Sequence, residues 1–255
     1  MMRREFGPGS FEAADLRAGR VEPNYEKVLT RLLAAHALAE KLTAEGYARA
    51  QGFSADPALQ RVVGKNLGEE RKHARLIYAA LAELGVTEAR ADRSLISALK
   101  APSFAAPRHF AEEARDQLDL VMASVSLDMT GLIMIGVNYK ESSYAPHARA
   151  AEIILAEEEE HELFAAGELR DAAEHFGAER VNAALREWLP RAVNFFGPPG
   201  SGFTYECMRY GLKTRDNGEL AELYLSLLER RLSQAGLELP ALTTDYPHQL
   251  LALAE

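Results

Sequence analysis

The chain has 255 residues, of which 47% are hydrophobic and 26% are charged, so it is neither a disordered chain nor a membrane-spanning one, and one domain with or without an extension is expected. The net charge of −9, without a concentrated basic patch, argues against nucleic acid as a partner. No apolar run reaches the roughly 20 residues of a membrane helix, and the polar start indicates no signal peptide. The single Cys207 fits a reducing cytoplasm. We therefore expect a cytoplasmic protein without a membrane or nucleic-acid partner.

Helix-start and helix-stop residues divide the chain into four long helices between residues 23 and 177. Residues 1–22 before them read as irregular. The expected boundaries are Pro23 with Asn24 as the cap, Asp56 and Pro57 to Gly85, Pro107 for the third helix, and Pro146 to Gly177. Residues 86–106 would form the long crossover between two helix pairs.

Residues 178–255 read as a helical extension packed on these four helices. A helix with Trp188 is expected over residues 178–195, and a turn-rich loop over 195–202. A further helix runs from about Asp216 to Ala235, and the tail after it looks extended. The predicted fold class is therefore all-α, with a four-helix bundle and additional C-terminal helices.

A doubled motif lies inside the four helices. Glu-x-x-His occurs twice, and each copy follows an acidic residue by 30 positions. The two sets, offset from each other by 88 residues, are Glu40, Glu70 and His73, and Asp128, Glu158 and His161. Residues i and i+3 share one helix face, so each Glu and His can reach one site together. Four carboxylates and two imidazoles from four helices are the ligand set of a ferritin-like di-iron or di-manganese bundle.

Hydrophobic periodicity supports this reading, because each carboxylate interrupts an apolar stripe of period three to four near its middle. An unpaired buried carboxylate costs several kcal/mol or changes its protonation. Four such groups in one core layer would repel one another, and a pair of metal ions would remove that cost. Oxygen and imidazole ligands suit iron or manganese better than zinc or copper.

Some residues leave alternatives open. Glu45 competes with Glu40 as the ligand of the first helix, although the interval of 30 residues favours Glu40. His36, one turn before Glu40, reads equally as a residue supporting the site or as a core histidine. Three of the four residues Glu157–Glu160 are expected to be exposed. The other histidines lack a motif and are expected at the surface: His109, His147, His175 and His248. Gly131 and Gly136 permit a kink or close packing near Asp128.

The chain also resembles the phenylacetate-CoA oxygenase family, in particular the catalytic A subunit of bacterial multicomponent phenylacetyl-CoA epoxidases. The resemblance extends from the first bundle helix to the C-terminal helix. Its most specific segments are Ser143-Tyr144-Ala145-Pro146, Phe196-Gly197-Pro198 and Leu237-Glu238-Leu239-Pro240. The six candidate ligands match the family's ligand positions one by one, which is typical of its catalytic subunits. The chain is shorter at the N-terminus than the A subunit.

The resemblance implies a di-iron enzyme that inserts one oxygen atom from O₂ into an aromatic acyl-CoA, with Glu70 and Glu158 bridging the irons. The chain has no cysteine cluster and no dinucleotide fingerprint. A separate NAD(P)H-dependent reductase would therefore supply electrons. Related enzymes are complexes, so we expect a homo-oligomer or a hetero-oligomer with a related helical subunit.

Four other functions are compatible with the same ligands. They are a ferritin-like iron oxidase or store, a hydroxylase of another small molecule or of modified tRNA, a manganese enzyme that destroys peroxide, and a non-catalytic partner subunit. The first predicts no apolar pocket beside the metals.

Overall fold

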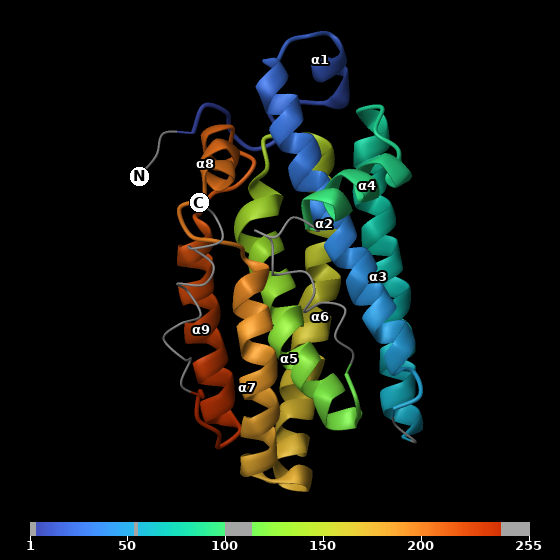
Figure 1. Ribbon diagram of the computed structural model, residues 1–255, viewed down its shortest axis with the longest axis vertical. Helices are drawn as coiled ribbons and strands as arrows, with labels where there is room; N and C mark the ends of the chain where they lie inside the picture. The colour runs from blue at the N-terminus through green and yellow to red at the C-terminus, as the bar shows by residue number, and fades with distance from the viewer. Residues whose placement is uncertain (1–3, 54–55, 100–113, 241–255) are drawn as a thin grey trace.

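The computed structural model describes residues 4–53, 56–99 and 114–240. The described residues form helices and no β-strand, which confirms the all-α prediction. Two antiparallel hairpins make up a four-helix bundle, and α3 packs against α6 to join them (Figure 1). The hairpins are α2 (Pro23–Ala50) with α3 (Pro57–Glu83), and α5 (Gln117–Ile133) with α6 (Ala145–Phe176). The ferritin-like architecture predicted from the doubled motif is consistent with this arrangement.

The starts of the first two bundle helices follow from their prolines. Asp56 caps α3 as predicted, since its side chain accepts the Ala58 N–H at 2.8 Å. The predicted cap of α2 was wrong. With Pro23 in the first helical position, the preceding Glu22 becomes the N-cap. The side-chain amide of Asn24 donates instead to the carboxylate of Glu206 and the hydroxyl of Tyr210, both in the C-terminal region.

The crossover contains a helix that was not predicted, α4 (Glu88–Leu99). Asp92 anchors α4 to the first hairpin by accepting hydrogen bonds from Lys41 at 2.7 Å and Tyr78 at 2.5 Å. The helix that carries Asp128 begins at Gln117 with Asp116 as its cap, so the predicted opening at Pro107 was wrong. Pro107 itself lies outside the described residues.

The C-terminal end of α5 changes its helical form. It continues as a π-helical turn, η2 (Met134–Asn138), and a 3₁₀ turn, η3 (Tyr139–Glu141). The buried Asn138 accepts backbone N–H groups from Thr214 at 3.0 Å and Arg215 at 3.1 Å. These bonds come from a segment distant in sequence and fix the wider turn.

The segment Gln117–Glu141 is long and apolar enough to cross a membrane by length and composition, with a mean hydropathy of 1.9 in its best window. From the sequence alone, no apolar run of this length was expected. In that window 61% is buried within the protein, as is typical of the core helix of a bundle. Packing against α6 and α7 accounts for this burial.

The described part of residues 1–22 is not irregular as predicted. It contains a short helix, α1 (Ala13–Arg17), and Phe11 pairs with the backbone around Tyr144. The rings of Phe6 and Phe11 pack edge-on against Tyr25 at 5.9 and 5.3 Å. Two phenylalanines in a short polar segment were the signal for this docking.

In the C-terminal region, α7 (Ala178–Phe195) packs on α5 as another core helix, and α9 (Asn217–Gln234) also contacts α5 (Figure 1). Both helices were predicted, whereas α8 (Gly202–Arg209) was not. The division of the chain into segments 1–22, 23–177 and 178–255 remains a prediction. Residues 241–255 lie outside the described part.

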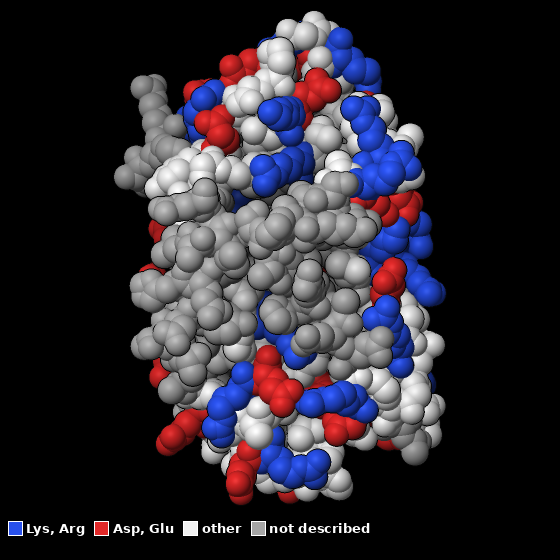
Figure 2. Space-filling view, in the orientation of Figure 1, with Lys and Arg blue, Asp and Glu red and all other residues white. Residues whose placement is uncertain are grey.

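Acidic and basic side chains are interspersed at the surface. Figure 2 shows both kinds of side chain on the face that it draws. Ion pairs join separate elements, for example Arg149 with Glu12 at 2.6 Å and Lys65 with Glu160 at 2.8 Å. Such exposed pairs contribute about 0–1 kcal/mol each, so burial of the apolar helix faces carries most of the stability.

Candidate metal centre

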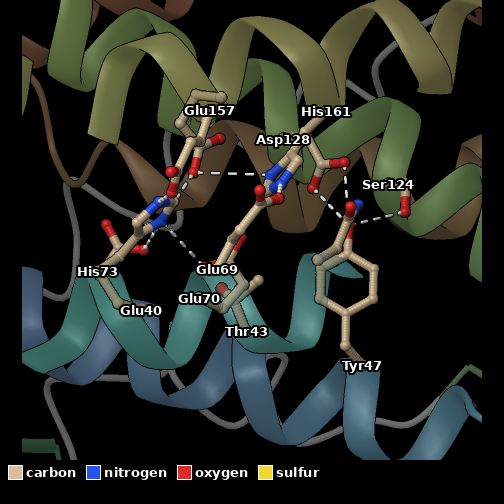
Figure 3. A network of polar contacts seen from close by, with 12 residues as sticks. Glu40, Thr43, Tyr47, Glu69, Glu70, His73, Ser124, Asp128, Glu157 and His161 are labelled. Carbon is tan, nitrogen blue, oxygen red and sulfur yellow. Dashed lines mark hydrogen bonds and ion pairs between the residues drawn. The ribbon is translucent and has the colours of Figure 1, made fainter. Parts of the chain in front are cut away.

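The structure brings the six predicted residues into one layer of the bundle. Glu40 comes from α2, Glu70 and His73 from α3, Asp128 from α5, and Glu158 and His161 from α6. Figure 3 labels five of these six residues, all except Glu158. All six side chains are buried. The six exposed fractions are 7% for Glu40, 2% for Glu70, 0% for His73, 6% for Asp128, 4% for Glu158 and 1% for His161.

The two bridging candidates, Glu70 and Glu158, lie at the middle of the cluster. One ligand atom from each of these residues, from Glu40 and from His73 lies within 4.8 Å of the others. His161 reaches the same carboxylates, since its Nδ1 lies 3.5 Å from Glu70 Oε1 and 3.9 Å from Glu158 Oε1. Each central carboxylate therefore faces both histidines.

The two histidines have matching carboxylate partners at Nε2. His73 Nε2 lies 2.9 Å from Glu157 Oε2, and His161 Nε2 lies 2.9 Å from Glu69 Oε2. The Nδ1 atoms of both rings are buried and have no hydrogen-bond partner among the described residues. An imidazole that donates one N–H to a carboxylate presents the other nitrogen as a lone pair, which is the arrangement of a metal-ligating histidine. The side chains present thus fit a pair of metal ions.

Glu69 and Glu157 extend the doubled motif beyond the predicted ligands. Each stands directly before a central glutamate and supports the histidine of the other hairpin, and the two are again 88 residues apart. The prediction that three of Glu157–Glu160 are exposed was wrong for Glu157, whose side chain is 21% exposed and also pairs with Lys72. The signal was the longer repeat Glu-Glu-x-x-His.

At one end of the cluster, a phenol supports the carboxylate of Asp128. Tyr47 Oη lies 3.2 and 3.1 Å from the two oxygens of Asp128 and receives a hydrogen bond from Asn66 at 3.3 Å. Tyr47 stands seven residues after Glu40, on the same apolar stripe of its helix. Since a stripe position does not show where a terminal hydroxyl points, this contact could not be read from the sequence.

At the other end, histidines support the carboxylate of Glu40. His36 Nε2 lies 2.7 Å from Glu40 Oε1, which decides between the two readings left open for His36 in favour of support. Glu45, the competitor of Glu40, has a side chain that is 51% exposed and lies outside the cluster. His147 was expected at the surface, and this was wrong, because it is fully buried beside His36. His175 is exposed as predicted, whereas His109 and His248 lie outside the described residues.

Burial and mutual repulsion perturb the acids of the cluster. Burial raises the pKa of Glu70 well above its usual range, and the charge of Glu158 raises it further. Burial and the same neighbour raise the pKa of Asp128. Burial also acts on Glu40, but the hydrogen bond with His36 and the proximity of His73 outweigh it and lower the pKa of Glu40. Without cations, this layer holds more negative charge than its surroundings stabilise.

A family model described as phenylacetic acid catabolic protein matches residues 21–249. The chain belongs to this family. The match runs from the start of α2 past the end of α9, so it includes all six candidate ligands. No curated protein matches the chain. Family membership confirms the relation expected from the sequence and supports a role in phenylacetic acid catabolism.

In this member of the phenylacetic acid catabolic family, a pocket lined mainly by apolar side chains lies beside the cluster. Asp128, Thr43 and Leu127 line both this pocket and the smaller cavity at the carboxylates. The rest of the wall is largely apolar, including Leu42, Phe53, Ala114, Leu120, Ala123 and Trp188. A molecule in the pocket would therefore be adjacent to the candidate metal ligands.

We predict that Gly131→Ala weakens metal binding. A Cβ at Gly131 would lie 3.0 Å from Glu158 Oε2, so it would displace a central carboxylate. This contact confirms that Gly131 allows close packing at the site. The helix itself gains from alanine by up to about 1 kcal/mol. We expect roughly tenfold weaker Mn²⁺ binding by calorimetric titration, with secondary structure retained in circular dichroism.

Gly68→Ala is the matched control, because a Cβ at Gly68, in α3, would meet nothing within 4 Å. This variant should keep wild-type Mn²⁺ affinity. Equal affinities of the Gly131→Ala variant and the wild type would contradict the close approach of Glu158.

Proposed function

We propose that the chain is the catalytic subunit of a di-iron oxygenase that inserts one oxygen atom from O₂ into an aromatic acyl-CoA such as phenylacetyl-CoA. The main support is the pair of buried Nδ1 atoms of His73 and His161, which lack hydrogen-bond partners and face the three carboxylates of Glu40, Glu70 and Glu158. Membership of the phenylacetic acid catabolic family supports the substrate class.

In this proposal, each metal has one histidine and one terminal carboxylate. Glu40 and His73 would hold one iron, and Asp128 and His161 the other, with Glu70 and Glu158 between them. Manganese suits the same donor set. Iron bound here would supply the electrons that activate O₂ for transfer of one oxygen atom to the aromatic ring.

The overall reaction would give a ring 1,2-epoxide and water from substrate, O₂, two electrons and two protons. The two electrons would come from a separate NAD(P)H-dependent reductase. The family membership also favours work within a multi-subunit complex, with copies of this chain or a related helical subunit.

The residues around the centre would orient the substrate and exclude water. The apolar wall of the pocket favours an aromatic ring over bulk water, and its shared residues bring that ring beside Asp128. Tyr47 would hold the Asp128 carboxylate through its hydroxyl, while Glu69 and Glu157 would hold the two histidine rings in orientation.

Two of the rival functions are less well supported. An iron oxidase or store needs no apolar pocket, yet one adjoins the cluster. A non-catalytic partner subunit has no need of six converging residues, all of them buried. Hydroxylation of another small molecule uses the same site and is an outcome of the test below.

The decisive experiment loads the purified chain anaerobically with Fe²⁺ and exposes it to O₂ with phenylacetyl-CoA and a chemical reductant. About two irons per chain and an oxygenated CoA product by mass spectrometry would support the proposal. Two irons and O₂ consumption without a product would contradict the substrate class. A chain without bound iron would contradict the metal centre.

We further predict that Ala123→Trp, which fills the apolar pocket, lowers product formation at least tenfold without lowering iron content. Ala123 lines the pocket but not the carboxylate cavity, so the added ring would occupy substrate space. Ala123→Val is the control of smaller volume and should retain most of the product formation. Full turnover by the Trp variant would place the substrate elsewhere.

A further inference from the structure

The doubled motif is symmetric at the histidines but not at the terminal carboxylates. Glu69 and Glu157 support the two histidines at equal distances of 2.9 Å. Asp128 is contacted by a phenol, whereas Glu40 is contacted by an imidazole. The imidazole that contacts Glu40, His36, contacts a second buried histidine, His147, which has no role in the proposed function.

This continuation is a chain of two buried histidines behind Glu40. His36 Nε2 lies 2.7 Å from Glu40 Oε1, and His36 Nδ1 lies 3.0 Å from His147 Nε2. The exposed fractions of His36 and His147 are 5% and 0%. The ring of Tyr139 packs at 4.6 and 4.8 Å from the two imidazoles and closes the space around them. His147 lies in the first turn of α6, so the chain links Glu40 in α2 to the second hairpin.

The donors along this chain follow from what each group can do. A carboxylate only accepts, so His36 Nε2 carries the hydrogen toward Glu40. With that hydrogen at Nε2, Nδ1 of His36 is the atom that accepts, and His147 Nε2 donates to it. The remaining nitrogen, His147 Nδ1, is buried without a partner, which fits an unprotonated atom better than an unsatisfied N–H group. Burial also lowers the pKa of His147 well below its usual range.

We propose that His147 is a positioning residue for the metal centre, a role that rests on the proposed function. By donating to His36 Nδ1, it fixes the tautomer of His36, which in turn holds Glu40 Oε1. The other oxygen of Glu40 is thereby directed to the cluster, where Oε2 lies 3.5 Å from the free Nδ1 of His73. The metal position of Glu40 and His73 thus depends on a residue of the other hairpin.

The first test compares His147→Leu with His147→Gln by anaerobic Fe²⁺ titration. Leucine removes the donor, whereas the glutamine amide can place an N–H near the position of Nε2. Loss of a group that supports a metal ligand typically weakens binding 10- to 100-fold. We expect a loss of this size in the Leu variant at one of two metal positions, and recovery to within a few-fold of wild type in the Gln variant.

The outcomes separate this inference from the proposed function. Two irons bound by His147→Leu with wild-type affinity would overturn the inference and leave the metal centre intact. Equal weakening in both variants would also overturn it, since the donor would then not matter. A wild-type chain that binds no iron would overturn both. O₂ and acyl-CoA are absent from the titration, so an incorrect substrate class does not affect it.

The second test needs no variant. Nitrogen chemical shifts of ¹⁵N-histidine-labelled, metal-free protein report which ring nitrogen carries hydrogen. We expect His36 and His147 both to be protonated at Nε2 and not at Nδ1. Protonation of His36 at Nδ1 would overturn the inference, even if His147→Leu fails to fold.

Discussion

Glu70→Gln is expected to abolish tight metal binding and, at the same time, to stabilise the metal-free protein. Glu70 is 2% exposed and lies at the middle of the cluster, where burial and the charge of Glu158 raise its pKa. Glutamine keeps the volume but removes the charge, so repulsion within the acidic layer falls. Single substitutions that relieve an unfavourable feature commonly stabilise by roughly 0.5–2 kcal/mol. For a chain of this size, this corresponds to a rise in Tm of a few degrees.

Metal content of the purified variant and its Tm after chelation measure the two effects. Glu45→Gln is the matched control, because Glu45 lies in a helix of the same bundle, α2, but has a side chain that is 51% exposed. It should leave both quantities unchanged. His161→Ala should also lose metal, without the gain in stability, because it leaves the carboxylates charged. Normal metal content in both Glu70→Gln and His161→Ala would contradict the ligand assignment.

The convergence of the six residues could be predicted because it follows from local sequence patterns, namely helical periodicity and regular spacing. A period of three to four residues places each carboxylate on the buried face of its helix, and equal intervals of 30 residues bring them to one depth. The all-α fold and the helix ends set by Asp56 and Gly177 follow from similarly local rules, which the structure bears out.

The features that were missed depend on distant segments. His147 stands in the first turn of a helix, where a lone histidine reads as exposed, and only the docking of α2 buries it against His36. The π turn ending in Asn138 depends on backbone groups 76 and 77 residues away. The helix α4 is held through Asp92 by side chains of α2 and α3. Such contacts leave no periodic signal in a single sequence.

Metal loading is expected to stabilise the chain, and the gain should grow as the pH rises from about 5 to 8. Free Mn²⁺ at 100 times its Kd would contribute about 2.7 kcal/mol per site, or roughly 5–11 °C in Tm. In the metal-free protein, Glu70, Asp128 and Glu158 have raised pKa values. Their contribution to stability is therefore complete below the unfolded values of 4.5, 3.8 and 4.5 and is lost as the pH rises.

The raised pKa of His73 and the lowered pKa of Glu40 do not reverse this dependence of the stability gain on pH. The pKa of His73 is raised, since the nearby carboxylates of Glu158, Glu40 and Glu70 outweigh its burial. Its contribution is complete below the unfolded value of 6.5 and falls as the pH rises. Glu40 has a lowered pKa, so its contribution is lost only as the pH falls below 4.5 and is constant in this range.

The difference in Tm between Mn²⁺-loaded and chelated protein, measured from pH 5 to 8, tests this expectation. Metal binding releases protons from its ligands, so affinity also rises with pH and acts in the same direction. His147, with its lowered pKa, destabilises both forms on acidification and largely cancels in the difference. The Glu70→Gln variant should show a flatter profile because it lacks the central charge. A difference that shrinks with rising pH would mean that the buried acids are not neutralised by metal.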